Sequence, residues 1–365
     1  RCFLISIQFV FRRLSTKEEN VARQKSAQPS IADVAKLAGV SLGTVSNVLN
    51  SPDRVKEETA RRVHRAIEGL GFVRNDAARQ LKAGKSSAIG LVVLDSTNPF
   101  FAELSRGAED SAIESGFQVL IGNSDHDKSR EASHLRIFQE QRLSGVLLSP
   151  IENASLEIQS LRDVGTHVVI VDQKALPDFC CSVSVDDIAG GEMAVQHLIE
   201  QGKKRIAFVG GSLDIVQVAD RLQGANLAKL KAGGSVELEA YRAQNQDVIS
   251  GRMIGRQILS LPEIERPDGV FAANDLLAVG LMQAFVLDNR IKVPQDIAII
   301  GYDDIDFAEA AVVPLSSIKQ PAKLLGSTAL GLLIDEIENG NTHKHQQITF
   351  QPELIVRAST KGSDN

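Results

Sequence analysis

The sequence predicts an α/β protein in which a small all-α unit precedes a two-lobed core of doubly wound parallel sheets. Two short amphipathic helices separated by Gly39 predict the small unit, and strand–helix alternation from Ser86 onward predicts the core. A chain of 365 residues exceeds one typical domain, and a hydrophobic content of 43% is enough for a substantial core. Residues 30–85 carry a net charge of +4 although the whole chain carries −6, which restricts a polyanionic partner to the first part of the chain.

Residues 30–49 predict two helices joined by one tight turn. Ser30 and Asp33 have the spacing of a capping box at the start of the first helix. Gly39 supplies the turn, since glycine adopts positive φ at little cost, and Ser41 caps the second helix. The first helix has an apolar face at helical spacing, made by Ile31, Val34, Ala35 and Ala38.

The second helix predicts a DNA-reading surface. Its inner face is apolar, through Val45, Val48 and Leu49, and its outer face is small and polar, which fits the major groove. A third helix, opened by Pro52 and Asp53, closes the small core and carries basic side chains suited to phosphate. The predicted DNA-binding residues of the second helix are Ser41, Leu42, Gly43, Thr44, Ser46 and Asn47, of which Leu42, Gly43 and Asn47 hold the base-reading positions. The predicted phosphate-facing residues are Arg54, Lys56, Arg61, Arg62 and Arg65.

Several motifs in order resemble the LacI/GalR (lactose-repressor) family of bacterial transcription regulators, over residues 30–360. The headpiece motifs are Ile31-Ala32-Asp33-Val34-Ala35, Ala38-Gly39-Val40-Ser41, Thr44-Val45-Ser46 and Val48-Leu49-Asn50, and Asn75 to Lys82 continue the match. The resemblance implies a headpiece at 30–75, a hinge helix or linker at 76–85 and a periplasmic-binding-protein-like core at 86–365. By the same analogy, one lobe takes 86–185 and 316–341, the other takes 186–315 and 342–360, and crossovers lie near 185, 315 and 342.

Continuous apolar runs that alternate with helical segments are typical of parallel sheets covered on both faces. Strands are expected at 88–94, 117–122, 145–149, 167–172, 205–210, 269–273 and 296–301. Helices are expected at 102–116, 128–142, 156–165, 193–201, 221–232 and 276–289.

Polar residues directly after several predicted strands indicate a ligand site, because ligands of such sheets bind at the carboxyl ends of the strands. These are Asp95, Asp172, Asn274 and Asp303; Arg221 is expected to start a helix, and Gln320 to lie at a late crossover. Carboxylates and amides suit the hydroxyl pairs of a sugar, and Phe100 and Phe101 offer an apolar face for its ring. The alternative for each residue alone is strand-end capping or turn chemistry. The resemblance implies that Asp172, Arg221, Asn274, Asp303 and Gln320 touch a small effector.

Residues 76–83 favour a helix too short to be stable alone in water. The resemblance implies a hinge helix that orders on DNA, with Leu81 as a minor-groove wedge and Arg79 and Lys82 as further DNA contacts. The alternative is an ordinary linker with Leu81 docked on the core. Two features depart from the family: Phe72-Val73-Arg74-Asn75 stands where Tyr-x-Pro-Asn is usual, and Gly43 offers no side chain to a base.

The remaining features indicate neither a metal site nor a cofactor. Cys2, Cys180 and Cys181 lack disulfide or metal spacing, and His343 and His345 lie in a polar segment and are expected to be solvated. Residues 1–29 are expected to be a disordered or misannotated extension; the alternative is a signal peptide. The common nucleotide, zinc and serine-hydrolase motifs are absent, so we expect no catalytic activity.

The resulting expectation is a homodimeric repressor, in the bacterial cytoplasm and associated with the nucleoid, that binds double-stranded operator DNA and a carbohydrate effector and contacts no membrane. Three alternatives stay open: a regulator with a purine or nucleoside corepressor, a sugar sensor or solute-binding protein without a DNA role, and a carbohydrate-active enzyme.

Overall fold

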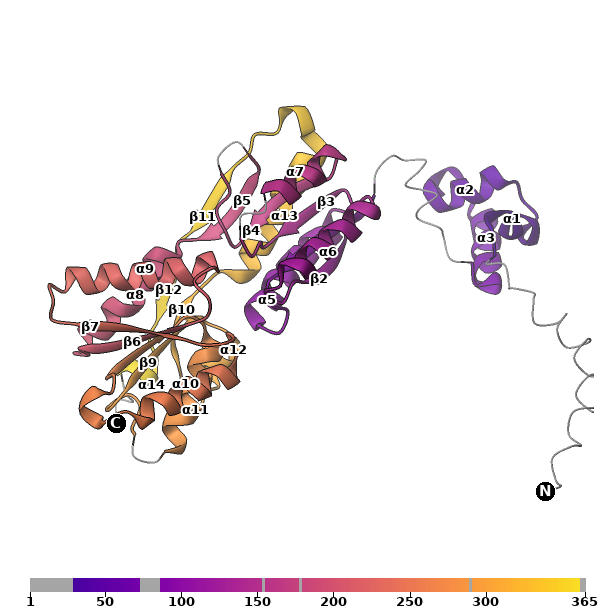
Figure 1. Cartoon of the computed structure of the whole chain (residues 1–365). Coiled ribbons are helices and arrows are strands. Elements are labelled where there is room, and N and C mark those ends of the chain that lie inside the picture. Colours follow the sequence, from indigo (N-terminus) through magenta and orange to yellow (C-terminus); the bar gives the residue numbers. More distant parts are fainter. Residues whose placement is uncertain (1–28, 73–85, 153–154, 177–178, 289–290, 362–365) are drawn as a thin grey trace, which may run out of the picture. The chain divides into compact units, whose positions relative to one another are not determined.

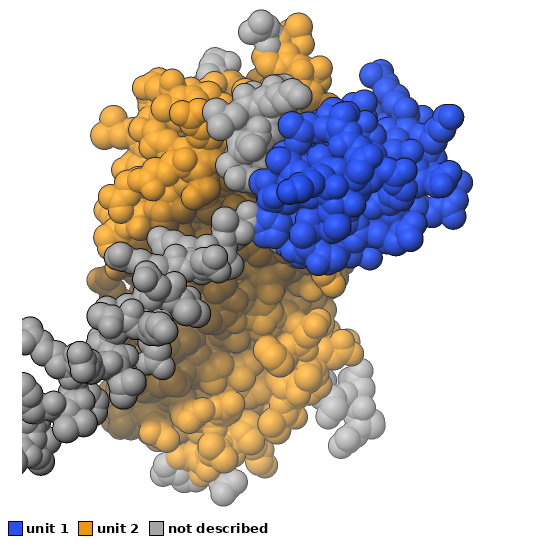
Figure 2. Space-filling model, turned by 90° about the vertical axis from the view of Figure 1, so that its right-hand side faces the viewer, with its two compact units in different colours: residues 1–84 blue, residues 85–365 orange. Residues whose placement is uncertain are grey.

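The computed structural model describes residues 29–72, 86–152, 155–176, 179–288 and 291–361. Contacts divide the chain into two compact units, residues 1–84 and 85–365 (Figure 2). The predicted hinge at 76–83, with Arg79, Leu81 and Lys82, lies outside the described residues, as do residues 1–28. No described helix is long and apolar enough to cross a membrane.

The first unit is a three-helix headpiece with a small core. Helices α1 (Ile31–Ala38) and α2 (Leu42–Asn50) are joined by Gly39, which has a φ of 62°. Both sides of the Ser30–Asp33 capping box are formed, as the sequence predicted. The core of this unit consists of Val34, Ala35, Ala38, Val45, Val48, Val63 and Ala66, with partly buried neighbours.

Two details of the headpiece differ from the prediction. Pro52–Arg54 forms a separate 3-10 turn, η1, and the third helix, α3 (Glu57–Leu70), starts only after Val55 has passed through an extended conformation. Ile31, the first residue of α1, is 38% exposed and is not part of the buried face that Val34, Ala35 and Ala38 form.

The core contains two six-stranded sheets, each with helices on both faces (Figure 1). The first sheet has the order β11-β5-β4-β3-β1-β2 and is parallel throughout. The second has the order β12-β10-β9-β8-β6-β7, and only β12 is antiparallel. The doubly wound architecture predicted from the apolar runs is confirmed.

The first lobe is built on the first sheet. Helices α5 and α13 pack together on one face, and α6 and α7 lie on the other. Its elements are β1 (Ala88–Val93), α5 (Pro99–Glu114), β2 (Gln118–Asn123), α6 (Lys128–Glu140), β3 (Gly145–Leu148), α7 (Ser155–Asp163), β4 (His167–Val171), β5 (Cys181–Val185), α13 (Ala322–Asn339), η3 (Gly340–Thr342) and β11 (Gln347–Phe350).

The second lobe is built on the second sheet. Helices α8 and α9 cover one face, and α10 and α11 cover the other. Its elements are α8 (Asp187–Glu200), β6 (Arg205–Gly210), α9 (Val216–Lys231), β7 (Glu237–Arg242), α10 (Val248–Ser260), η2 (Glu263–Glu265), β8 (Gly269–Ala272), α11 (Asp275–Leu287), β9 (Ala298–Asp303), α12 (Asp306–Glu309), β10 (Ser316–Lys319), β12 (Glu353–Ile355) and α14 (Ala358–Lys361).

Close packing of α8 against α9 positions a buried arginine. A Cβ on Gly191 would lie 2.1 Å from the carbonyl oxygen of Arg221, so only glycine permits this approach. Arg221 lies in the second turn of α9 and does not start a helix, because α9 already begins at Val216.

The chain crosses between lobes after β5, after β10 and between β11 and β12. The later two crossovers therefore lie beyond residues 315 and 342, where the family analogy had placed them. The reason is strand pairing: Ser316–Lys319 pairs with β9 of the second sheet, and Gln347–Phe350 pairs with β5 of the first. Each crossover follows the end of its strand.

Candidate functional site

The outer face of α2 presents the predicted base-reading residues. Ser41 caps the helix, and its Oγ accepts a hydrogen bond from the Thr44 amide at 3.1 Å. Leu42, with 53% of its surface exposed, lies beside the exposed Gly43 and Asn47. Thr44 and Ser46 are half-buried, and Ser46 accepts hydrogen bonds from the Asn50 amide group. The first turn of α2 and Asn47 are therefore the most accessible parts of this face.

Arg62 does not project toward a phosphate, contrary to the sequence-based expectation. Its Nη2 donates to the carbonyl oxygen of Ala38 at 2.6 Å and to that of Gly39 at 3.1 Å. The guanidinium therefore satisfies the last carbonyls of α1, which have no partner inside the helix. Arg61, one residue earlier, is exposed and makes only a surface ion pair with Glu57, at 3.4 Å.

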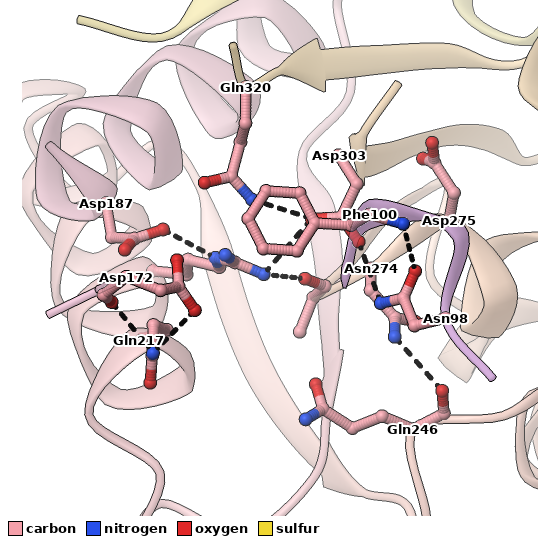
Figure 3. Close-up of polar contacts among 12 residues, drawn as sticks. Asn98, Phe100, Asp172, Asp187, Gln217, Gln246, Asn274, Asp275, Asp303 and Gln320 are labelled. Carbon is pink, nitrogen blue, oxygen red and sulfur yellow. Dashed lines mark hydrogen bonds and ion pairs between the residues drawn. The ribbon is translucent and has the colours of Figure 1, made fainter. Parts of the chain in front are cut away.

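In the core, five predicted effector residues converge on one buried cluster (Figure 3). Four of them stand where strands of the two sheets end, and the fifth projects from α9. The ends of β4, β8, β9 and β10 supply Asp172, Asn274, Asp303 and Gln320, and α9 supplies Arg221.

Arg221 is the charged centre of this cluster. Its Nε donates to Asp187 Oδ1 at 2.7 Å, and its Nη1 donates to the carbonyl oxygen of Ala273 at 2.6 Å. The guanidinium lies over the Tyr302 ring, 3.7 Å from the ring centre, and Nη1 is 3.9 Å from Asp303 Oδ1. This arrangement holds a cation in a buried site through paired charges and a π face.

Asp303 joins the two lobes. Its Oδ2 accepts a hydrogen bond at 3.2 Å from Asn98 Nδ2, and Asn98 is the N-cap of α5 in the first lobe. Its Oδ1 accepts another from Gln320 Nε2 at 2.8 Å.

A second inter-lobe contact involves Asp172. Gln217 Nε2, on α9, donates to the main-chain oxygen of Asp172 at 2.8 Å and to Asp172 Oδ2 at 2.7 Å. Asp172 and Asp303 have φ values of 66° and 104°. Non-glycine residues adopt that region at a cost of about 1–3 kcal/mol, and such strain clusters at ligand sites.

Burial shifts the ionisation of the cluster. It raises the pKa of Asp172 well above its usual range, and Asp187 raises it further, against the opposing effect of Arg221. Burial also raises the pKa of Asp303 to about 6, although Arg221 lowers it. Burial alone would lower the pKa of Arg221, but Asp187, Tyr302 and other neighbours outweigh burial and raise it, so Arg221 remains cationic.

The cluster borders a small, partly open cavity of about 40 Å³. Larger cavities of about 280 Å³ and 480 Å³ adjoin it: the first shares Asp172 and Gln217 with it, and the second shares Phe100 and Asp303. In this cluster, Asp172 Oδ1, Gln217 Oε1 and Gln320 Oε1 are among the buried oxygens that have no hydrogen-bond partner in the described part of the chain. The cluster thus retains unused acceptors for a hydroxyl-bearing ligand.

The other residues predicted for the effector site lie around the same small cavity or beside it. Phe100 and Phe101 line the small cavity and pack edge to face, with ring centres 5.0 Å apart. Asp95 also lines it, but its Oδ1 accepts from the Thr97 amide at 2.8 Å, which is turn chemistry. Asn274 caps α11 and donates to the main-chain oxygen of Gln246 at 3.0 Å.

Sequence reasoning missed Asn98, Asp187 and Gln217. Gln217 lies four residues before Arg221 on the same helix, and that spacing could have identified it. The expectation that His343 is solvated is also wrong. Its side chain is 1% exposed, because it packs against β5 and its Nδ1 donates to the Asp335 carboxylate.

Comparisons with known proteins cover both units. Residues 30–75 match the family "Bacterial regulatory proteins, lacI family", and residues 195–360 match "Periplasmic binding protein-like domain". The ribose operon repressor of Escherichia coli is 35% identical over 332 residues, which cover 90% of this chain and 99% of that protein. The transcriptional repressor PurR of Aliivibrio fischeri is 32% identical, over 90% of this chain and 98% of that protein.

Solved structures of similar fold also include transcription regulators. A LacI family regulator from Enterococcus faecium with bound ribose has a TM-score of 0.68 and 29% identity, over 76% of this chain and all of that one. A Lac repressor dimer bound to operator, 24% identical, shares the fold with a TM-score of 0.76, over 92% of this chain and 99% of that one.

Proposed function

The chain belongs to the LacI family of bacterial transcription regulators, and we propose that it is a repressor that releases its operator when a sugar binds between its lobes. The observation that carries this proposal is the buried cluster around Arg221. The guanidinium pairs with Asp187 and Asp303 of the second lobe, and Asp172 of the first lobe interacts with it electrostatically. The headpiece supplies the DNA-reading helix, and the core supplies the effector site.

The chemistry of the cluster favours a sugar. A sugar hydroxyl both donates and accepts, so it pairs with the open oxygens of Asp172 and Gln320 and with the guanidinium of Arg221. Phe100 and Phe101 supply an apolar surface for the carbon face of the ring. The ribose operon repressor and the ribose-bound regulator are similar along most of this chain, so ribose is the first sugar to test.

The two hydrogen bonds between the lobes suggest how an effector changes the arrangement of the lobes. Asn98, Asp303, Gln217 and Asp172 all line the small cavity of about 40 Å³, so we expect a bound sugar to separate Asn98 from Asp303 and Gln217 from Asp172. The sugar then replaces these bonds with its own and resets the lobe arrangement. Strand β1 of the first lobe follows the hinge directly along the chain, so this rearrangement reaches the DNA-binding segments.

We further propose a homodimer that works in the cytoplasm on double-stranded operator DNA and catalyses no reaction. The first part of α2, with Asn47, reads bases, and Leu81 of the hinge wedges the minor groove while Arg79 and Lys82 contact the backbone. The relatives named above are transcription regulators, and the similar Lac repressor structure is a dimer on operator.

Calorimetric titration of the full-length protein with ribose, cellobiose and hypoxanthine tests the effector site. We expect a sugar to bind, Asp303→Asn to abolish binding, and Asp214→Asn, an exposed carboxylate of the same lobe, to bind normally. Binding of hypoxanthine alone would instead support a purine corepressor. Sugar binding that survives Asp303→Asn would remove this cluster from the effector site.

A further inference from the structure

A second cluster of chemically active side chains lies in the first lobe, outside the effector site. Cys181 is the first residue of β5, and His343 and His345 precede β11. Parallel pairing of β11 with β5, with Gln347 opposite Ser182, brings these distant segments together. The Cys181 Sγ lies 3.2 Å from His343 Nε2 and 3.8 Å from His345 Nδ1.

The geometry of the three atoms matches a tetrahedral metal site. Zinc binds thiolate sulfur at about 2.3 Å and imidazole nitrogen at about 2.0 Å, which places sulfur and nitrogen about 3.5 Å apart at a tetrahedral angle. The two observed sulfur–nitrogen distances, 3.2 Å and 3.8 Å, lie on either side of that value. All three ligand atoms lie within 4.8 Å of one another.

A carboxylate on α13 aims one of the imidazoles. Asp335 Oδ2 is 2.6 Å from His343 Nδ1, which leaves Nε2 directed at Cys181. A carboxylate on the far nitrogen of a histidine is the usual outer partner of a metal-bound imidazole, because it fixes the tautomer and orients the ring.

The second imidazole has a competing partner. Arg162 Nη2 lies 3.2 Å from His345 Nε2 and, as an obligate donor, leaves the proton of a neutral ring on Nδ1. Coordination through Nδ1 requires this proton to move and Arg162 to turn toward the Glu336 carboxylate, 3.8 Å away. The buried Glu336 Oε2 has no hydrogen-bond partner among the described residues.

We propose that Cys181, His343 and His345 bind one zinc-class transition-metal ion, with Asp335 orienting His343 and the fourth position left to water. Nitrogen and sulfur ligands select zinc over magnesium or calcium. The ion ties β5 to the segment before β11. Both strands lead into crossovers between the lobes, so the ion stiffens the first-lobe ends of these crossovers.

The test uses untagged full-length protein that carries Cys2→Ser and has been treated with a chelator. Titration with Zn²⁺ alone, followed by calorimetry, is expected to show one ion per chain and a rise in thermal midpoint with Zn²⁺ concentration. Titration with Co²⁺ alone is expected to produce a thiolate-to-cobalt absorption band. Cys181→Ser should abolish the band and weaken Zn²⁺ binding at least tenfold.

Cys180→Ser is the matched control, since Cys180 is the adjacent buried cysteine and is not part of the cluster. It should keep the band and the affinity, and Asp335→Asn should keep the band but bind Zn²⁺ about 10–100-fold more weakly. A band that survives Cys181→Ser, an equal loss in Cys180→Ser, or no binding of either ion would overturn the proposal. If Cys181→Ser does not fold, the partly exposed His345→Gln takes its place with the same expected losses.

Discussion

Replacing Arg221 with Met should destabilise the core strongly. The substitution keeps a long side chain but removes the cation that lies 2.7 Å from Asp187 and 3.9 Å from Asp303. Both carboxylates are buried, and removing one partner of a buried pair costs about 3–5 kcal/mol, because the other charge stays uncompensated. We expect Arg221→Met to lower the free energy of unfolding by that amount.

Urea denaturation of the full-length protein measures this loss of stability. Circular dichroism follows the unfolding, because the chain contains no Trp whose fluorescence could report it. Arg256→Met, an exposed arginine of the same lobe, is the matched control and should change stability by less than about 0.5 kcal/mol. The double variant Arg221→Met/Asp187→Asn should recover part of the loss, since one uncompensated charge is gone. A loss below about 1 kcal/mol for Arg221→Met, or no recovery in the double variant, would refute this reasoning.

Four further predictions concern the two functional surfaces. Burial raises the pKa of Asp303 from 3.8 to about 6, so ionisation of this carboxyl destabilises the folded state increasingly between about pH 4 and pH 6. Urea denaturation should therefore show Asp303→Asn gaining stability relative to wild type as the pH rises through that range, and a constant stability difference would contradict this. Arg62→Met should destabilise the headpiece by about 1–3 kcal/mol, measured by hydrogen exchange, whereas Arg61→Met should spare stability and weaken binding to all DNA sequences alike. Asn47→Ala should cost about 1–3 kcal/mol of discrimination at one base pair, and an unchanged operator preference in a binding-site selection would remove it from the reading face. Leu81→Ala should weaken operator binding but not binding to random duplex, and an equal loss on both would exclude the wedge.

The sheets could be predicted because their central strands are buried on both faces. Strands such as Gly145–Leu148 and Gly269–Ala272 are apolar throughout and stand out from the helices around them. The edge strand β7 escaped prediction because Glu237–Arg242 is mostly exposed and charged. Strand β5 escaped because Cys181–Val185 mixes serine with apolar residues, although every residue in it is buried.

Whether a strand could be recognised in the sequence also decided which effector-site residues could be predicted. Polar residues at the ends of recognised strands, such as Asp172 and Asn274, could be found because parallel strands bring their carboxyl ends to one edge. Asp187 could not, because it follows the unrecognised β5. The Asn98–Asp303 bond joins two lobes, and no local pattern encodes such a contact. The Cys181–His343 pair depends in the same way on the pairing of β5 with β11.

If sugar releases the operator, the two ligands must weaken each other's binding by the same factor. The operator affinity of the full-length protein is measured without and with saturating sugar, and the sugar affinity without and with operator. We expect sugar to weaken operator binding by about 5–150-fold, operator to weaken sugar binding by the same factor, and Asp303→Asn to abolish the response. An operator affinity that sugar leaves unchanged or increases would contradict it.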